Sequence, residues 1–261
     1  MILRCMLLAT VFTFLAQRPT MADDHPLSKK QRDEFAETFD ASIEALSKQI
    51  EKSPREVGLY SQRGDAYFFR AKFKEAVANY EKMVELDPKR DASHWRRGIA
   101  FFYAEKYKQA AHQFEIYHSF DDVDRENGIW RYLSQHKAYG QKKARQGLLK
   151  YKKDDREPFP SVYKLFAGDI TPDAILKQIA DAKIDDEARE VRLCYAQLYI
   201  GLNYAVEKNP IKAIIHLREA TANKWGPRAS YGPKYMWHVG RLHYELLLAA
   251  QKKNAKKADD K

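Results

Sequence analysis

A short phrase of sequence recurs at an interval of 34 residues, and this recurrence constrains the fold more than any other feature of the chain. Residues 60–69 read YSQRGDAYFF, and residues 94–103 read HWRRGIAFFY. Both phrases contain Arg-Gly-x-Ala-x-Phe, which sets Gly64 and Gly98 in the same place of each phrase. Self-similarity at a fixed period of this size indicates a repeat architecture. We therefore expect stacked copies of one structural unit.

Small and large side chains outside these phrases follow the same period. The aligned sets are Pro54 with Pro88, Tyr67 with Phe101, Ala76 with Ala110 and Ala144, and Tyr80 with Phe114 and Leu148. A small residue in the first helix of a unit lets the second helix approach closely. An alanine in the second helix keeps the distance between the two helices short where they cross. A proline ends the second helix, because its ring disfavours the helical conformation of the preceding residue. This pattern resembles the tetratricopeptide repeat (TPR), a 34-residue helix-turn-helix unit.

The predicted fold class is all-α, since helix-forming residues dominate and runs of β-branched residues are scarce. We predict a TPR α-solenoid with an N-terminal capping helix and a C-terminal helical extension. The predicted parts are a capping helix within 23–56, a TPR array at 57–153 with regular repeats at 57–90 and 91–124 and a degenerate hairpin at 125–153, a helical region at 161–251 containing a TPR-like hairpin at 188–223, and a basic tail at 252–261. The last hairpin is expected to have a lengthened turn around 207–210.

The first 22 residues have the layout of a secretory signal peptide. Arg4 precedes an apolar run at 5–16, and small residues follow before a cleavage point after Ala22, with Ala16 as the second choice. A run of 12 residues is too short to cross a bilayer, which takes roughly 20 residues. We therefore predict an exported protein, periplasmic or secreted, with no transmembrane segment in the mature chain.

Positive charge exceeds negative charge in the chain as a whole, with 46 Lys and Arg residues against 36 Asp and Glu residues. Loss of residues 1–22 removes Arg4 and Arg18 and lowers the formal net charge from +10 to +8. This excess favours anionic partners such as acidic wall polymers or lipid headgroups. The charges are mostly interspersed, as on a solvated helical surface, so no nucleic-acid partner is expected.

Several blocks in order resemble the NlpI-type TPR lipoproteins of bacterial envelopes over roughly residues 55–247. The blocks are ASHWRRGIAFFYAEKYKQAAHQF, GIWRYLSQ, KLFAGDITPDAIL, CYAQLYIGL and AIIHLREATAN. The resemblance implies a helical and often dimeric periplasmic scaffold, an adaptor that binds peptidoglycan hydrolases and presents them to a processing protease. Members of that family are lipidated on a Cys after the apolar run, whereas Cys5 precedes it here. Lipid anchoring is therefore not expected.

The sequence contains no recognisable catalytic signature. The eight His residues show no HExxH spacing, and GxSxG, P-loop and GxGxxG motifs do not occur. Cys194 lies in an apolar helical stretch, where a buried thiol acting as a small hydrophobe is expected. We predict no enzyme activity, no catalytic residues, no metal site and no cofactor.

Binding is the predicted activity, and the first helix of each unit indicates where. In TPR units the variable positions of this helix face a concave groove, and in this chain they are strongly aromatic. The candidate groove residues are Ser61, Asp65, Phe68, Trp95, Arg96, Ile99, Phe102, Tyr103 and Trp130. Aromatic residues in a groove are good anchors for a partner protein. The alternative is that the C-terminal helices of the chain itself fill this groove.

Overall fold

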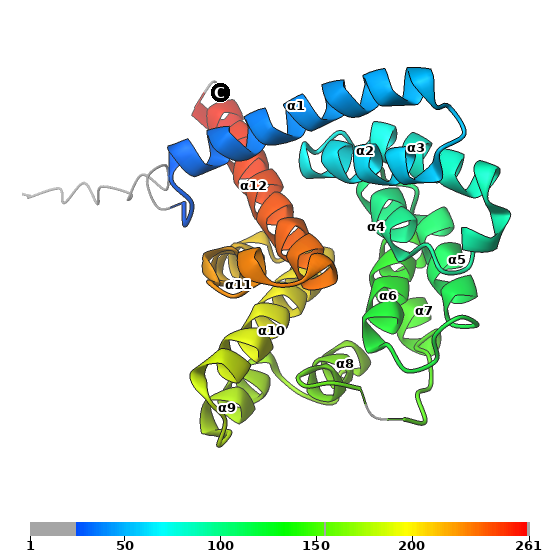
Figure 1. Ribbon diagram of the computed structural model, residues 1–261. Coiled ribbons are helices and arrows are strands. Elements are labelled where there is room, and N and C mark those ends of the chain that lie inside the picture. The colour runs from blue at the N-terminus through cyan, green and yellow to red at the C-terminus, as the bar shows by residue number, and fades with distance from the viewer. Residues whose placement is uncertain (1–24, 154, 260–261) are drawn as a thin grey trace, which may run out of the picture.

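The computed structural model describes residues 25–153 and 155–259, and all regular secondary structure in this part is helical (Figure 1). The α-helices are α1 (Lys29–Lys52), α2 (Val57–Phe69), α3 (Phe73–Leu86), α4 (Trp95–Tyr103), α5 (Tyr107–Tyr117), α6 (Arg125–Tyr139), α7 (Gln141–Gln146), α8 (Phe159–Ala167), α9 (Pro172–Asp181), α10 (Asp186–Val206), α11 (Pro210–Ala222) and α12 (Tyr231–Asp259). Two short 3-10 helices lie at Pro88–Arg90 and Gly226–Arg228. The all-α prediction is confirmed. The predicted signal peptide lies outside the described residues.

Helix α1 begins at a capping box. The Ser28 hydroxyl accepts from the Gln31 backbone N–H (3.2 Å), and the Gln31 side chain accepts from the Ser28 N–H (2.9 Å). Such reciprocal bonds satisfy two N–H groups that have no partner within the helix. Leu46 and Ile50 are buried in the second half of α1, which packs on α2. This half therefore covers the first end of the helical stack.

Helices α2 and α3, and helices α4 and α5, form two pairs with the same turn. Each turn contains a residue with positive φ, Ala71 at 55° and Glu105 at 61°. The N–H of the next residue donates five residues back, from Lys72 to the Tyr67 carbonyl and from Lys106 to the Phe101 carbonyl. These bonds form the Schellman end of a helix. The 34-residue period therefore holds in the backbone itself.

The pair formed by α10 and α11 contains a third copy of this turn. Lys208 has φ 60°, and the Asn209 N–H donates to the Tyr204 carbonyl. A Cβ atom at Gly201 would lie 2.6 Å from the Leu217 side chain, with the same 16-residue separation as Gly64 and Tyr80 in the first pair. The predicted lengthening of the 207–210 turn is therefore wrong, because the turn matches the regular ones residue for residue.

Close helix contact at the two repeated glycines follows the expectation from the sequence. A Cβ atom at Gly64 would lie 2.6 Å from the Tyr80 ring, and a Cβ atom at Gly98 would lie 2.6 Å from the Phe114 ring. An arginine beside each glycine adds a polar link between the helices. Arg63 donates to the Asn79 side chain (2.9 Å), and Arg97 donates to the Gln113 side chain (2.7 Å).

The third pair, α6 and α7, departs from the first two. Helix α7 has only six residues, so Leu148 lies beyond its end although Ala144 is buried as predicted. Tyr132, which replaces the small residue, packs edge-on against Phe166 of α8 (ring centroids 5.1 Å apart). Helix α8 therefore contacts the face of α6 that a longer second helix would otherwise cover.

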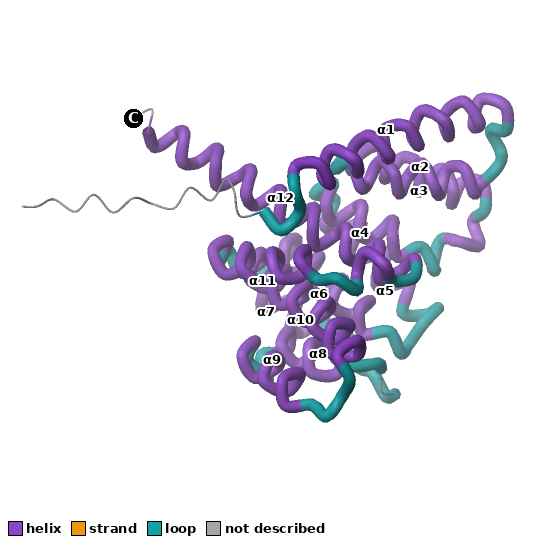
Figure 2. The backbone as a smooth tube through the Cα atoms, turned by 60° about the vertical axis from the view of Figure 1, so that its left-hand side comes forward, coloured by secondary structure: helices purple, strands orange, loops and turns teal. Residues whose placement is uncertain are grey.

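The helices follow an arch that the last helix closes. In Figure 1, α2–α7 descend on one side, α8 lies at the bottom, and α9–α11 return on the other side. Helix α12 then runs back towards α1, and its C-terminal end projects from the body in Figure 2. The predicted separate basic tail at 252–261 is corrected in part, because α12 continues through Asp259.

Helix α9 begins at a threonine cap followed by a proline. Thr171 caps α9 by accepting from the Ala174 N–H (3.2 Å), and Pro172 is the first helical residue. Within residues 25–153 and 155–259, no helix combines the length and the apolar character that crossing a membrane demands.

Candidate functional site

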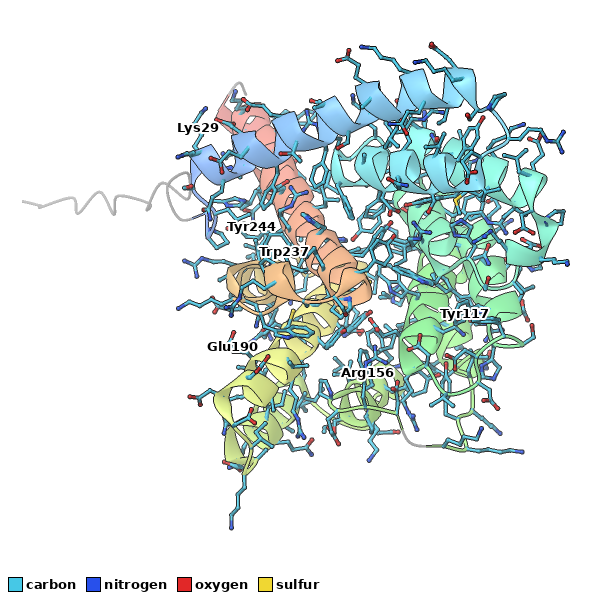
Figure 3. The ribbon with its side chains drawn as sticks, in the orientation of Figure 1. Lys29, Tyr117, Arg156, Glu190, Trp237 and Tyr244 are labelled. Atoms are coloured by element: carbon cyan, nitrogen blue, oxygen red, sulfur yellow. The ribbon has the colours of Figure 1, made fainter. Side chains whose placement is uncertain are left out.

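Helix α12 lies against the helices whose variable positions were expected to face a groove. The ring of Phe68 on α2 stacks on Tyr235 of α12, with centroids 5.1 Å apart. The Tyr103 hydroxyl on α4 hydrogen-bonds Nδ1 of His243 on α12 (2.9 Å). Figure 3 shows the side chains of α12 filling the space beside α1 and α2. The chain's own C-terminal helix therefore occupies the upper part of the concave face.

A buried carboxylate joins this helix to the stack. The Asp65 carboxylate accepts from the Tyr80 hydroxyl (2.6 Å), from Nη1 of Arg96 (2.6 Å) and from the Tyr231 hydroxyl of α12. The guanidinium of Arg96 also donates to Ser61 (2.9 Å). Among the predicted groove residues, Arg96 thus bonds both Ser61 and Asp65, and Asp65 bonds the C-terminal helix.

The nine predicted residues divide into two groups. Those engaged within the fold are Ser61, Asp65, Phe68, Arg96, Phe102 and Tyr103. Phe68 has no exposed surface, and Phe102 is 6% exposed against Trp130 and Tyr107, so neither side chain is open to a partner. Trp95, Ile99 and Trp130 instead line a pocket that α12 leaves unfilled.

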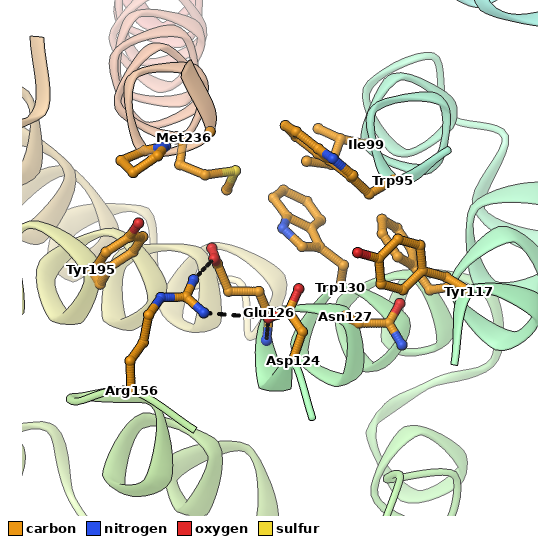
Figure 4. A pocket seen from close by; sticks show the side chains of 13 residues that line it. Trp95, Ile99, Tyr117, Asp124, Glu126, Asn127, Trp130, Arg156, Tyr195 and Met236 are labelled. Carbon is orange, nitrogen blue, oxygen red and sulfur yellow. Dashed lines mark hydrogen bonds and ion pairs between the residues drawn. The ribbon is translucent and has the colours of Figure 1, made fainter. Parts of the chain in front are cut away.

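This pocket has a volume of about 290 Å³ and lies between the helical stack and the returning helices (Figure 4). Its lining residues are Trp95, Ile99, Phe114, Tyr117, Asp124, Glu126, Asn127, Trp130, Arg156, Tyr195, Gly232, Pro233 and Met236. One wall is apolar and aromatic, and the opposite side carries carboxylates and a guanidinium. The pocket therefore has the two-sided chemistry of a binding site for an amphipathic group.

Arg156 links the acidic groups at the charged side of the pocket. Its guanidinium bonds the Glu126 carboxylate directly and lies 3.2 Å from Asp155 and 3.8 Å from Asp124. The same guanidinium lies over the Phe159 ring, 4.3 Å from the centroid. Three carboxylates therefore share one arginine, and the group has an excess of negative charge.

The elements around Asp124 and Glu126 fix both side chains. Asp124 caps α6 by accepting from the Glu126 N–H (3.0 Å), and Glu126 accepts from the Tyr199 hydroxyl of α10. Asp155 accepts from the backbone N–H of Arg125 (2.9 Å). Helix α6, the loop before α8 and helix α10 thus meet at one cluster.

Burial changes the acidity of this cluster. Desolvation, together with the neighbouring Asp124 charge, raises the pKa of Glu126 to about 7. Desolvation also raises the pKa of Asp124 to about 6, against the opposing effect of Arg156. A carboxylate in a poorly solvated site takes up protons more readily, because its charged form loses hydration. Both groups therefore titrate in the neutral range.

Two buried polar side chains in the pocket lining have no hydrogen-bond partner. The first is Trp130, which is 2% exposed and whose indole Nε1 has no acceptor. The second is Asn127, whose side-chain Nδ2 and Oδ1 both lack a partner. In Figure 4 the Trp130 ring points into the pocket between Trp95 and Glu126. A buried donor without a partner costs free energy, so the pocket presents an unused donor to whatever fills it.

Sequence reasoning missed Asp124, Glu126, Arg156, Tyr195 and Met236. Asp124 and Glu126 lie at the start of α6, Arg156 lies in the loop before α8, and Tyr195 and Met236 lie on α10 and α12. These elements are far apart in the sequence, so no local pattern groups the five residues. The charge-rich segment at 154–160, which contains Arg156, was the one available signal.

The remaining chemistry of the described residues is sparse. Cys194 is buried as predicted, and desolvation raises the pKa of its thiol to about 12, so it stays protonated. Within the described residues, no group of three or more His, Cys, Asp or Glu side chains is placed to hold a metal ion. Both oxygens of Glu126 already accept bonds, from Tyr199 and Arg156, which favours a binding role over proton transfer.

No protein-family model matches the chain, and no curated protein matches its sequence.

Proposed function

We propose that this protein is an exported TPR scaffold that binds another protein of the bacterial cell envelope in the pocket beside α12. The observation that carries the proposal is the pocket itself, which Trp95, Ile99 and Trp130 line and which α12 leaves unfilled. Aromatic side chains around a partly enclosed space are effective anchors for a partner segment.

The repeat part of the proposal is supported by agreement between sequence period and backbone geometry. The turns at Ala71, Glu105 and Lys208 share one conformation, and Gly64, Gly98 and Gly201 each contact a large residue 16 positions later. A TPR assignment accounts for both features with one unit. In this assignment α2–α3 and α4–α5 are regular repeats, α6–α7 is degenerate, and α10–α11 is a further repeat.

The envelope part of the proposal rests on sequence. The layout of residues 1–22 favours export, and the resemblance to the NlpI-type proteins favours a periplasmic adaptor. A peptidoglycan hydrolase or a processing protease is the partner class that this resemblance suggests, with a second copy of the chain as a further partner.

Affinity capture from a periplasmic extract tests the proposal. Trp95→Ala removes an aromatic wall of the pocket, so we expect captured envelope proteins to be lost or reduced at least tenfold. The matched control is Tyr139→Ala, which removes an exposed aromatic residue at the end of α6. Circular dichroism confirms that both variants are folded. Unchanged capture by folded Trp95→Ala contradicts the proposal.

A second candidate function is binding of an anionic wall polymer or membrane surface. The observation that favours it is the exposed basic end of α12, with Lys252, Lys253, Lys256 and Lys257 on the projecting segment. Salt separates the two candidates, because charge-driven binding weakens as the Debye length falls to about 3 Å at 1 M salt. Binding through an aromatic pocket is expected to persist at that ionic strength.

A further inference from the structure

We propose that the pocket takes a cation carried on an apolar stem, namely the side chain of a lysine or arginine in the partner protein. The inference rests on the proposed function and specifies which part of the partner enters this site. Three features of this one cavity support the inference. They are an acidic cluster with more carboxylates than cations, an aromatic wall, and a buried N–H donor that has no partner.

Charge balance is the first step. Asp124, Glu126 and Asp155 face one guanidinium, that of Arg156. The neighbouring Arg125 lies over the Tyr151 ring (5.2 Å), and no ion pair among the described residues joins it to these carboxylates. A second cation in the pocket balances the cluster further. The acidity of Glu126 agrees with this, because the Asp124 charge is the second cause of its raised pKa.

The apolar wall is the second step. Trp95, Ile99 and Met236 face the acidic side across the pocket in Figure 4. Methylene groups of a lysine or arginine stem gain from contact with such a wall, while the charged end stays among polar groups. A cation beside a tryptophan ring is also attracted by the ring itself. A neutral apolar side chain gains only the first of these contributions.

The unpartnered indole is the third and independent step. Nε1 of Trp130 has no acceptor, the residue is 2% exposed, and its ring points into the pocket. An indole N–H only donates, so it requires an acceptor on the ligand. A backbone carbonyl of the partner segment supplies one, which favours a residue within a peptide over a free amine. The volume of about 290 Å³ suits one long side chain and its peptide groups.

Titration with small probes tests the inference without any partner. The probes are N-acetyl-lysine methylamide, N-acetyl-arginine methylamide and the neutral analogue N-acetyl-norleucine methylamide. The readout is the ¹⁵N resonance of the four tryptophan indoles, with Trp95 and Trp130 assigned from Trp→Phe variants. We expect the Trp130 signal to shift and the cationic probes to bind at least tenfold more tightly than norleucine. Equal binding of the three probes overturns the inference, as does preference for a neutral sugar such as N-acetylglucosamine.

A charge-removing variant adds a second arm. Glu126→Gln keeps the shape of the side chain and removes its charge, so the lysine probe is expected to bind about tenfold more weakly, because hydrogen bonds to charged groups are the stronger ones. Glu44→Gln on the exposed face of α1 makes the same chemical change far from the pocket and should leave binding unchanged. Undiminished lysine binding by folded Glu126→Gln overturns the inference.

The pH dependence gives a third arm. The groups that interact with Glu126 are Asp124 at the cap of its own helix, Asp155 and Arg156 from the loop before α8, Tyr117 of α5, and Cys194, Tyr195 and Tyr199 of α10. A cation binds the ionised carboxylates better, so affinity for the lysine probe should rise from pH 5.5 to pH 8. The norleucine probe should show no such rise. A lysine affinity that is flat or falls over this range counts against the inference.

The outcomes of the probe titration and of affinity capture are separable. Capture that depends on Trp95, combined with equal binding of lysine and norleucine, overturns the cation inference and leaves the proposed function standing. Lysine-selective binding combined with capture that ignores Trp95 supports the cation site and overturns the function. Lysine selectivity together with Trp95-dependent capture supports both.

Discussion

At the scale of single residues, Asp65 was predicted to face a binding groove but instead bonds other residues within the fold. The repeat pattern predicted that Asp65 faces a groove, since its counterpart in the next phrase is Ile99. The structure instead gives its carboxylate three partners, of which Tyr231 comes from α12, 166 residues away. A single sequence does not reveal such a long-range contact, because nothing near Asp65 indicates that a C-terminal tyrosine reaches it.

The Asp65 network predicts a large effect of substitution. Asp65→Ala leaves the mostly buried Arg96 guanidinium without its ion-pair partner, so we expect the free energy of unfolding to fall by about 3–5 kcal/mol. Asp40→Ala is the matched control, because Asp40 pairs with Arg70 at the surface, and its loss should be much smaller. Urea unfolding followed by circular dichroism measures both. Equal losses in the two variants would contradict the structural role of Asp65.

Glu126 predicts a stability effect that depends on pH. Its pKa in the folded chain, about 7, lies above the ordinary value of a glutamate, so the folded state binds the proton more tightly than the unfolded state. The resulting stabilisation is present at low pH and is lost as pH rises through 7. Glu126→Gln cannot lose a proton, so relative to wild type it should gain about 1–3 kcal/mol between pH 5 and pH 8. Glu44→Gln should show little change between these two pH values.

At the scale of elements, the helical pairs are the part that the sequence predicted best. Gly64 and Gly98 lie against the large residues aligned with them, and the pairs α2–α3 and α4–α5 each fall within one of the predicted repeats at 57–90 and 91–124. The reason is physical, because a repeated close contact needs a small residue at a fixed place in every copy. The α7 region was predicted less well, since Ala144 keeps the period although α7 ends at Gln146.

Close packing at Gly98 predicts a cost for the smallest added side chain. A Cβ atom there would lie 2.6 Å from the Phe114 ring, so Gly98→Ala should destabilise the fold by about 1–3 kcal/mol. Gly232→Ala serves as the control, because a Cβ atom at Gly232 meets nothing within 4 Å. Thermal unfolding compares the two variants. A Gly98→Ala protein as stable as the control would show that the two helices do not pack this closely.

The shared turn predicts a stabilising substitution. Glu105 and Lys208 have φ near 60°, a conformation that disfavours residues with a Cβ atom and suits glycine. Glu105→Gly and Lys208→Gly should therefore each raise the free energy of unfolding by about 0.5–1 kcal/mol. Ala104→Gly, one position earlier at φ −81°, should lower it instead. A loss in all three variants is inconsistent with the described turns.

At the scale of the whole molecule, closure of the arch decides which predicted residues line a pocket and which pack against α12. The sequence left two alternatives open, an exposed groove or one filled by C-terminal helices, and the structure combines them. Helix α12 covers Phe68 and contacts Tyr103, whereas Trp95 and Trp130 still line a pocket. Helix α12 packs mainly on α11, and it also makes long-range ring contacts with α1, α2 and α4, such as Phe35 against Trp237 (5.9 Å), which no local pattern contains.

The position of α12 is the central claim, because it both fills the groove and forms one side of the pocket. Nuclear Overhauser contacts between the Phe68 and Tyr235 rings, measured in the full chain with selectively labelled phenylalanine and tyrosine, test it directly. Ring centroids 5.1 Å apart predict clear cross-peaks, which should disappear in a folded Tyr235→Leu control. A folded wild-type chain without these cross-peaks would mean that the groove is open and that the pocket described here does not form.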